Sequence, residues 1–157
     1  MDILDVLAAK RNLARRVVKD LVEHYKTLDD TERLEKSNTI LDEVNSYLQI
    51  EENQFFPFIR KTGEHEDLIR RIKDVHTRLE EVSEHAIMMH VDEPSGEYFH
   101  CMVKIGELLE LAKRADDEIL FPWAMAYLSE EDQYQIATHL KNEMVQESLP
   151  SSGMTVY

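Results

Sequence analysis

Two stretches of the chain follow one pattern: YLQIEENQFFP at residues 47–57 and AKRADDEILFP at residues 112–122. In each, two adjacent acidic residues precede a proline by six and five positions, and an aromatic residue comes directly before that proline. An internal repeat of this kind predicts two similar helical hairpins. Each acidic pair ends an apolar run of helical period, so one carboxylate of each pair should face inward. There it needs a metal, a proton or a fixed cation as a partner.

Around the two repeats, apolar residues recur at helical spacing in long segments. They predict helices at about 2–27, 31–60, 65–90 and 97–127, followed by a helix from about 130 to 148. Short connections between long helices favour antiparallel neighbours. We therefore expect an all-α fold, an up-down-up-down antiparallel four-helix bundle with an additional C-terminal helix. It forms one domain over 1–148, and 149–157 is expected to be a flexible tail.

Local signals mark where these helices begin, bend and end. Asp29-Asp30-Thr31 is expected to cap the second helix, and the SEED motif at 129–132 resembles a capping box that opens the last one. Turns are expected at 62–63 and 94–96. Because the helical pattern continues beyond Pro57 and Pro122, we expect each proline to kink a helix rather than end it.

Composition and charge exclude several classes of function. The 157 residues include only four glycines and four prolines, with 43% hydrophobic and 32% charged residues, which suits a helical protein. A formal charge of −14 argues against nucleic-acid and anionic-membrane partners. No apolar run approaches the roughly 20 residues that span a bilayer. The single cysteine, Cys101, cannot form an internal disulfide, so we expect a cytoplasmic protein.

Four ionisable residues fall on the inner faces of the predicted helices. At 100° per residue, Arg11, Glu51, His76 and Asp116 each lie within an apolar stripe, one from each long helix and at a similar height. Taken singly, the histidine could be an ordinary core residue, and the glutamate or arginine could extend to the rim. Their conjunction predicts one interior polar layer.

The repeats and this layer resemble the hemerythrin-like family, also called the HHE cation-binding domain. That family carries His-x-x-x-Glu-Glu-x-x-Leu-Phe-Pro, or a close variant, on its second and fourth helices, and both repeats match its acids, spacing and Phe-Pro. Its first-helix pattern aligns with residues 7–18 and its third-helix pattern with Asp74-Val75-His76. The resemblance covers about residues 2–128 and implies a four-helix bundle around a non-haem di-iron site.

The ligand positions that the resemblance implies are only half retained. Arg11, Tyr47 and Ala112 stand where the family has histidines, whereas Glu51, His76 and Asp116 remain. A di-iron centre would then lack terminal ligands, because Ala112 offers none and Tyr47 could bind only ferric iron, as a phenolate. Arg11 would bring a fixed positive charge among the carboxylates, so we expect a buried ion pair of Arg11 with Glu51, Asp116 or both.

Two functions of different classes follow. The first is a hemerythrin-like bundle that has lost its di-iron centre, holds no cofactor and acts as a non-catalytic binding or structural module. Its partner would be another protein, and the chain would be a monomer or homodimer. The alternative is a non-haem iron protein that handles O2, NO or peroxide, or senses iron, through Glu51, His76 and Asp116 with Tyr47.

A histidine phosphotransfer domain is a further four-helix possibility, suggested by His100, Lys104 and Gly106. That family places its lysine three residues after the histidine and its glycine directly after the lysine. Here the lysine follows by four residues and the glycine by six, so the spacing argues against phosphotransfer.

Overall fold

The computed structural model describes residues 3–61, 65–89 and 96–148, with side chains described as far as residue 141. Most of the turns predicted at 62–63 and 94–96, and the whole tail at 149–157, lie outside these residues. Within the described residues the regular structure is entirely helical, with no strand.

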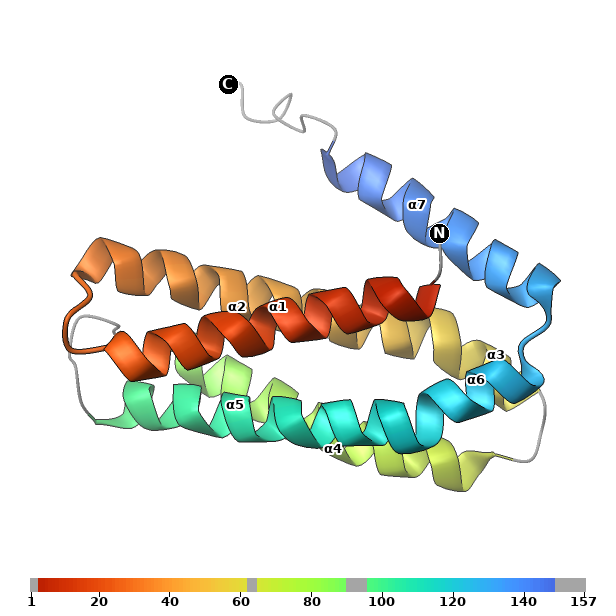
Figure 1. Ribbon diagram of the computed structural model, residues 1–157, viewed down its shortest axis with the longest axis horizontal. Coiled ribbons are helices and arrows are strands. Elements are labelled where there is room, and N and C mark those ends of the chain that lie inside the picture. The colour runs from red at the N-terminus through yellow and green to blue at the C-terminus, as the bar shows by residue number, and fades with distance from the viewer. Residues whose placement is uncertain (1–2, 62–64, 90–95, 149–157) are drawn as a thin grey trace.

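Four long helices run roughly along one axis, and successive ones point in opposite directions (Figure 1). They are α1 (Ile3–His24), α2 (Asp30–Ile50), α4 (Glu66–Ile87) and α5 (Glu97–Ala115). The first ends earlier than predicted because the backbone carbonyl of His24 accepts from both Thr27 and Leu28 in a closing turn. The second begins one residue earlier than predicted, since Asp29 caps it in a capping box with Glu32.

As predicted, helical structure continues past both prolines, and each of these two helical segments has three parts. A five-residue π-helix, η1 (Glu51–Phe55), links α2 to α3 (Phe56–Lys61). A second, η2 (Asp116–Leu120), links α5 to α6 (Phe121–Tyr127). In both cases the wider π-turn directly precedes a Phe-Pro pair. The proline has no backbone N–H, so it cannot donate the next hydrogen bond of a regular α-helix.

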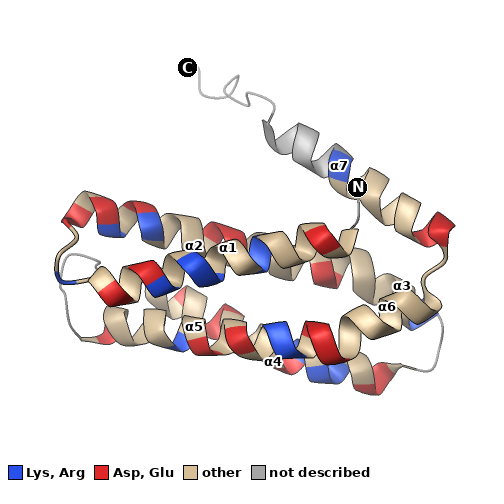
Figure 2. Ribbon diagram, in the orientation of Figure 1, with Lys and Arg blue, Asp and Glu red and all other residues tan. Residues whose placement is uncertain are grey.

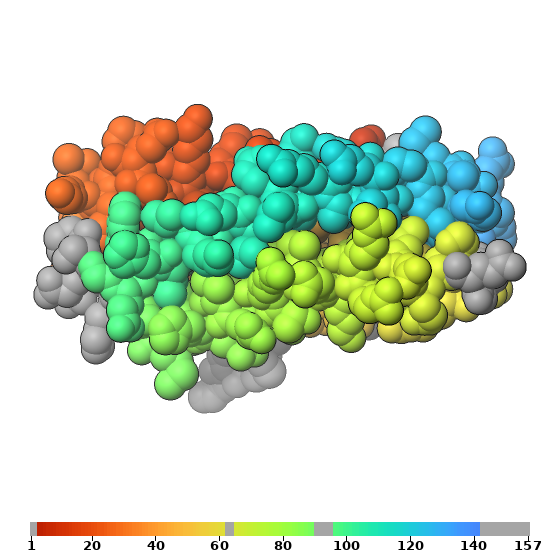
Figure 3. Space-filling view, turned by 90° about the horizontal axis from the view of Figure 1, so that it is seen from below, coloured from red at the N-terminus to blue at the C-terminus, as the bar shows by residue number. Residues whose placement is uncertain are grey.

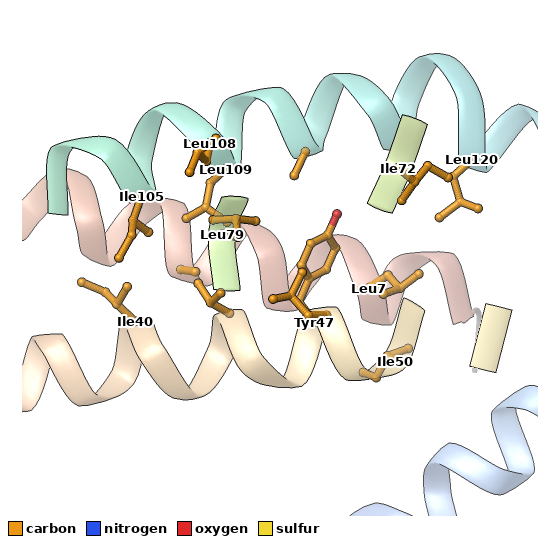
Figure 4. Packing of buried hydrophobic residues seen from close by; sticks show 14 of the residues in the cluster. Leu7, Ile40, Tyr47, Ile50, Ile72, Leu79, Ile105, Leu108, Leu109 and Leu120 are labelled. Atoms are coloured by element: carbon orange, nitrogen blue, oxygen red, sulfur yellow. The ribbon is translucent and has the colours of Figure 1, made fainter. Parts of the chain in front are cut away.

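The core lies between the four long helices. Figure 4 shows Ile40, Tyr47 and Ile50 of α2 facing Leu109 and Leu120 of α5 and η2 across the interior. Helix α1 packs against α2 and α5, and α4 packs against α5. Seen from below, α4 and α5 lie side by side and form one continuous face (Figure 3). By contrast, α2 and α4 approach each other much less closely.

The last helix, α7 (Glu130–Ser148), leaves the end of α6 and diverges from the axis of the long helices (Figure 1). Ile136 and Leu140 are buried, and the helix contacts α1 and η1. Among the described helices, none is long and apolar enough to cross a membrane.

Candidate functional site

The two sequence repeats build the same local structure, and each places one carboxylate inside the protein. Glu51 begins η1 and Asp116 begins η2, and both side chains are 0% exposed. The backbone N–H of Phe56 donates to the carbonyl of Glu51, and the N–H of Phe121 donates to the carbonyl of Asp116. These five-residue hydrogen bonds define π-turns, which are rare and often occur at functional sites.

On one side of the layer, Asp116 receives two donors at a single oxygen. Its Oδ2 lies 2.6 Å from Nη1 of Arg11 and 2.7 Å from the hydroxyl of Tyr47. Arg11 is 2% exposed, and its Nε and Nη2 also donate to Oδ1 of Asn12. The guanidinium is therefore buried and held by neighbours on two helices. Figure 4 shows the Tyr47 hydroxyl directed from α2 toward α5.

On the other side, His76 lies between two carboxylates. Its Nε2 is 2.7 Å from Oε1 of Glu51, and its Nδ1 is 3.1 Å from Oε2 of Glu52. The ring of Phe56 stacks on the imidazole with centroids 5.7 Å apart. Burial lowers the pKa of His76, but the hydrogen bonds to Glu51 and Glu52 outweigh it and raise the pKa to about 9. His76 is therefore an imidazolium at neutral pH, and both of its N–H groups donate.

Each of the two innermost carboxylates has one oxygen left over. Oε2 of Glu51 and Oδ1 of Asp116 are buried and make no hydrogen bond of ordinary geometry with the described residues. Burial, and then the adjacent Glu51 carboxylate, raise the pKa of Asp116, whereas the hydrogen bond from Tyr47 and the charge of Arg11 lower it. The positive charge of Arg11 lies against Asp116, and that of His76 lies between Glu51 and Glu52.

These residues do not fit a di-iron centre. A doubly protonated imidazole has no lone pair for a metal, and both nitrogens of His76 already face carboxylates. Burial, and then the charges of Glu51 and Asp116, raise the pKa of Tyr47 well above its usual value, which disfavours a phenolate. Ala112 is buried and offers no donor atom. Among the described residues, no three His, Cys, Asp or Glu side chains form a group that could hold a metal ion.

The structure thus brings together Arg11, Tyr47, Glu51, His76 and Asp116, with Ala112 one helical turn before Asp116. The direct partner of Arg11 is Asp116, whereas Glu51 is paired with His76. Sequence reasoning missed the role of Glu52, because an ideal helical wheel puts it on the flank. The second acidic residue of each repeat could have indicated this role. Its counterpart in the second repeat, Asp117, is however exposed and pairs with Lys113.

Comparison with models of protein families, with curated proteins and with solved structures finds no match to this chain.

Proposed function

We propose that the four long helices form a hemerythrin-like up-down-up-down bundle in which a buried ion-pair layer replaces the di-iron centre. In this proposal the protein is a non-catalytic binding or structural module of the cytoplasm. The observation that carries it is the buried contact of 2.6 Å between Nη1 of Arg11 and Oδ2 of Asp116. A guanidinium stays protonated under all ordinary conditions, so it repels any cation that approaches the same carboxylates.

The chemistry of the layer supports a structural role. Each charged side chain has a partner of opposite charge or a hydrogen-bond donor, and the layer joins α1, α2, η1, α4 and η2. A buried polar network of this kind specifies one register of the helices, because any slip strands a charge in the interior.

One observation favours a second candidate, an iron-binding protein that uses Glu51, His76 and Asp116. The leftover oxygens of Glu51 and Asp116 are the atoms that a bridging metal would use. That function requires His76 to lose a proton and release Glu51, and it requires Arg11 to leave Asp116. The ion-pair layer needs neither change, so we place it first.

A reversal experiment tests the proposal. The triple variant Arg11→His, Tyr47→His and Ala112→His restores a histidine at each position that the resemblance assigns to one, and it removes the competing cation. We expect this variant to bind ferrous iron at neutral pH and to gain thermal stability on binding, since the metal binds the native state. The gain should weaken below about pH 6, where imidazoles become protonated.

A matched control separates this site from general iron binding by histidine. The variant Arg16→His, Gln49→His and Leu111→His adds the same three side chains to the same three helices at exposed positions. It should give no stabilisation by iron. If the folded interior variant also binds no iron at neutral pH, the proposed correspondence with the family's ligand positions is wrong.

A further inference from the structure

A groove lies between α2 and α4 on one side of the protein. It has a volume of about 290 Å³ and is lined on α2 by Leu41, Val44 and Leu48 and on α4 by Ile87. Val44 and Leu48 are buried, so the floor of the groove is apolar. Helices α2 and α4 contact each other less than the other neighbouring pairs of long helices do.

The rim of the groove is acidic. Asp42 lies on the α2 side, and Glu80 and Glu84 lie one turn apart on the α4 side. No lysine or arginine in the described part of the chain forms a salt bridge with these three residues, although many other surface acids are paired. Burial, and then the charge of Glu52, raise the pKa of Glu80, as expected where negative charge is not compensated.

Apolar surface continues beyond the end of the groove. Ile87, which lines it, is 66% exposed, and the adjacent Met88 is 86% exposed. In addition, the buried hydroxyl of Ser83, on the groove wall, has no hydrogen-bond partner among the described residues. An apolar floor with exposed apolar residues at one end and a charged rim is the pattern of a protein-docking surface.

We infer that the α2–α4 groove binds a basic amphipathic helix of a partner protein, with its apolar stripe on Val44, Leu48 and Ile87 and its lysines or arginines on the acidic rim. The inference rests on the proposed role as a binding module and specifies its partner. The lining residues cover about eight positions of each helix, which is roughly 12 Å or two helical turns. A partner helix would therefore lie along the groove, as amphipathic helices do in apolar grooves.

The charge of the rim favours a basic helix over a second copy of the chain as the partner that binds in the groove. Two copies that met through this groove would bring their acidic rims together, and each chain carries a formal charge of −14. Figure 2 shows acidic residues distributed over all four long helices, so a second copy also brings negative charge. A cationic helix compensates the rim and covers the apolar floor at the same time.

Titration with a synthetic helix tests the inference. The probe is a leucine–lysine peptide of about 15 residues with one apolar stripe, and its control is a leucine–glutamate peptide of the same pattern. We expect the lysine peptide to bind and the glutamate peptide not to bind. The variant Asp42→Lys/Glu84→Lys should weaken binding by on the order of tenfold or more. The variant Glu23→Lys/Glu107→Lys, with the same charge change on other faces, should have much less effect.

A second pair of variants tests the apolar contact. Ile87→Asn should weaken binding, whereas Leu111→Asn, which removes an exposed apolar residue from α5, should not. Circular dichroism checks that each variant remains helical. Absence of binding, equal effects of the two charge reversals, or self-association through the groove would overturn the inference. Such a failure is distinct from failure of the ion-pair layer, because metal content tests the layer without reference to the groove.

Discussion

At the scale of single residues, the interior layer is defined by the pairs that its charged side chains form. Arg11 and Tyr47 both donate to Oδ2 of Asp116, while His76 donates to Glu51 and Glu52. The membership of Arg11, Glu51, His76 and Asp116 could be predicted from the sequence, since helical periodicity alone gives the inward face. The specific pairs could not, because side-chain reach and the placement of a proton depend on the distances between helices.

Replacement of Arg11 tests this pairing. Arg11→Ala removes one of the two positive charges, leaves the layer with net negative charge and opens a cavity where a long side chain was buried. We expect the free energy of unfolding to fall by about 3–5 kcal/mol in chemical denaturation. Arg16→Ala, at an exposed position of the same helix, is the control and should change it by no more than about 0.5 kcal/mol. Equal small effects of the two substitutions would contradict a buried ion pair.

At the scale of elements, the sequence predicted the long helices but not the π-turns. Periodicity located the helical segments, and the repeat indicated that residues 47–57 and 112–122 have similar structures. The prolines suggested kinks, because a missing N–H is visible in the sequence. The π-turns could not be predicted, because they depend on packing: the wider turn lets Glu51 and Asp116 face inward while the hydrophobic face continues to Phe55 and Leu120.

The start of α2 gives a prediction at this scale. Oδ1 of Asp29 accepts from the backbone N–H of Glu32 at 2.8 Å, and Oε1 of Glu32 accepts from the N–H of Asp29 at 3.1 Å. Asp29→Ala should therefore lower the free energy of unfolding by about 1 kcal/mol. Asp30→Ala removes an exposed carboxylate that pairs with the buried Arg33, whose Nε still donates to the carbonyl of Tyr25, so it should cost less than the loss of the cap. Thermal unfolding of both variants would show whether the cap has this role, and a reversed order would count against it.

At the scale of the whole molecule, the layer should make stability depend on pH. The native protein holds a proton on His76 up to a pKa of about 9, above the ordinary value of 6.5. Above about pH 6.5 the unfolded chain has released this proton. The stabilisation from His76 is complete below pH 6.5 and is lost as the pH rises through 9.

Denaturant titrations between pH 6.5 and 9 would measure this dependence. The free energy of unfolding should fall as pH rises, by up to about 1.4 kcal/mol per pH unit. A stability that is constant from pH 6.5 to 9 would show that His76 does not hold this proton.

The central claim, that an ion-pair layer stands in place of a metal centre, is tested most directly by the iron content of the whole protein. Protein produced in iron-rich medium and purified without chelators should be colourless and contain well under one iron per chain. The reason is that Arg11 and protonated His76 already neutralise the carboxylates that a metal would need. Iron close to two atoms per chain, together with the absorption band of an oxo bridge, would contradict the claim.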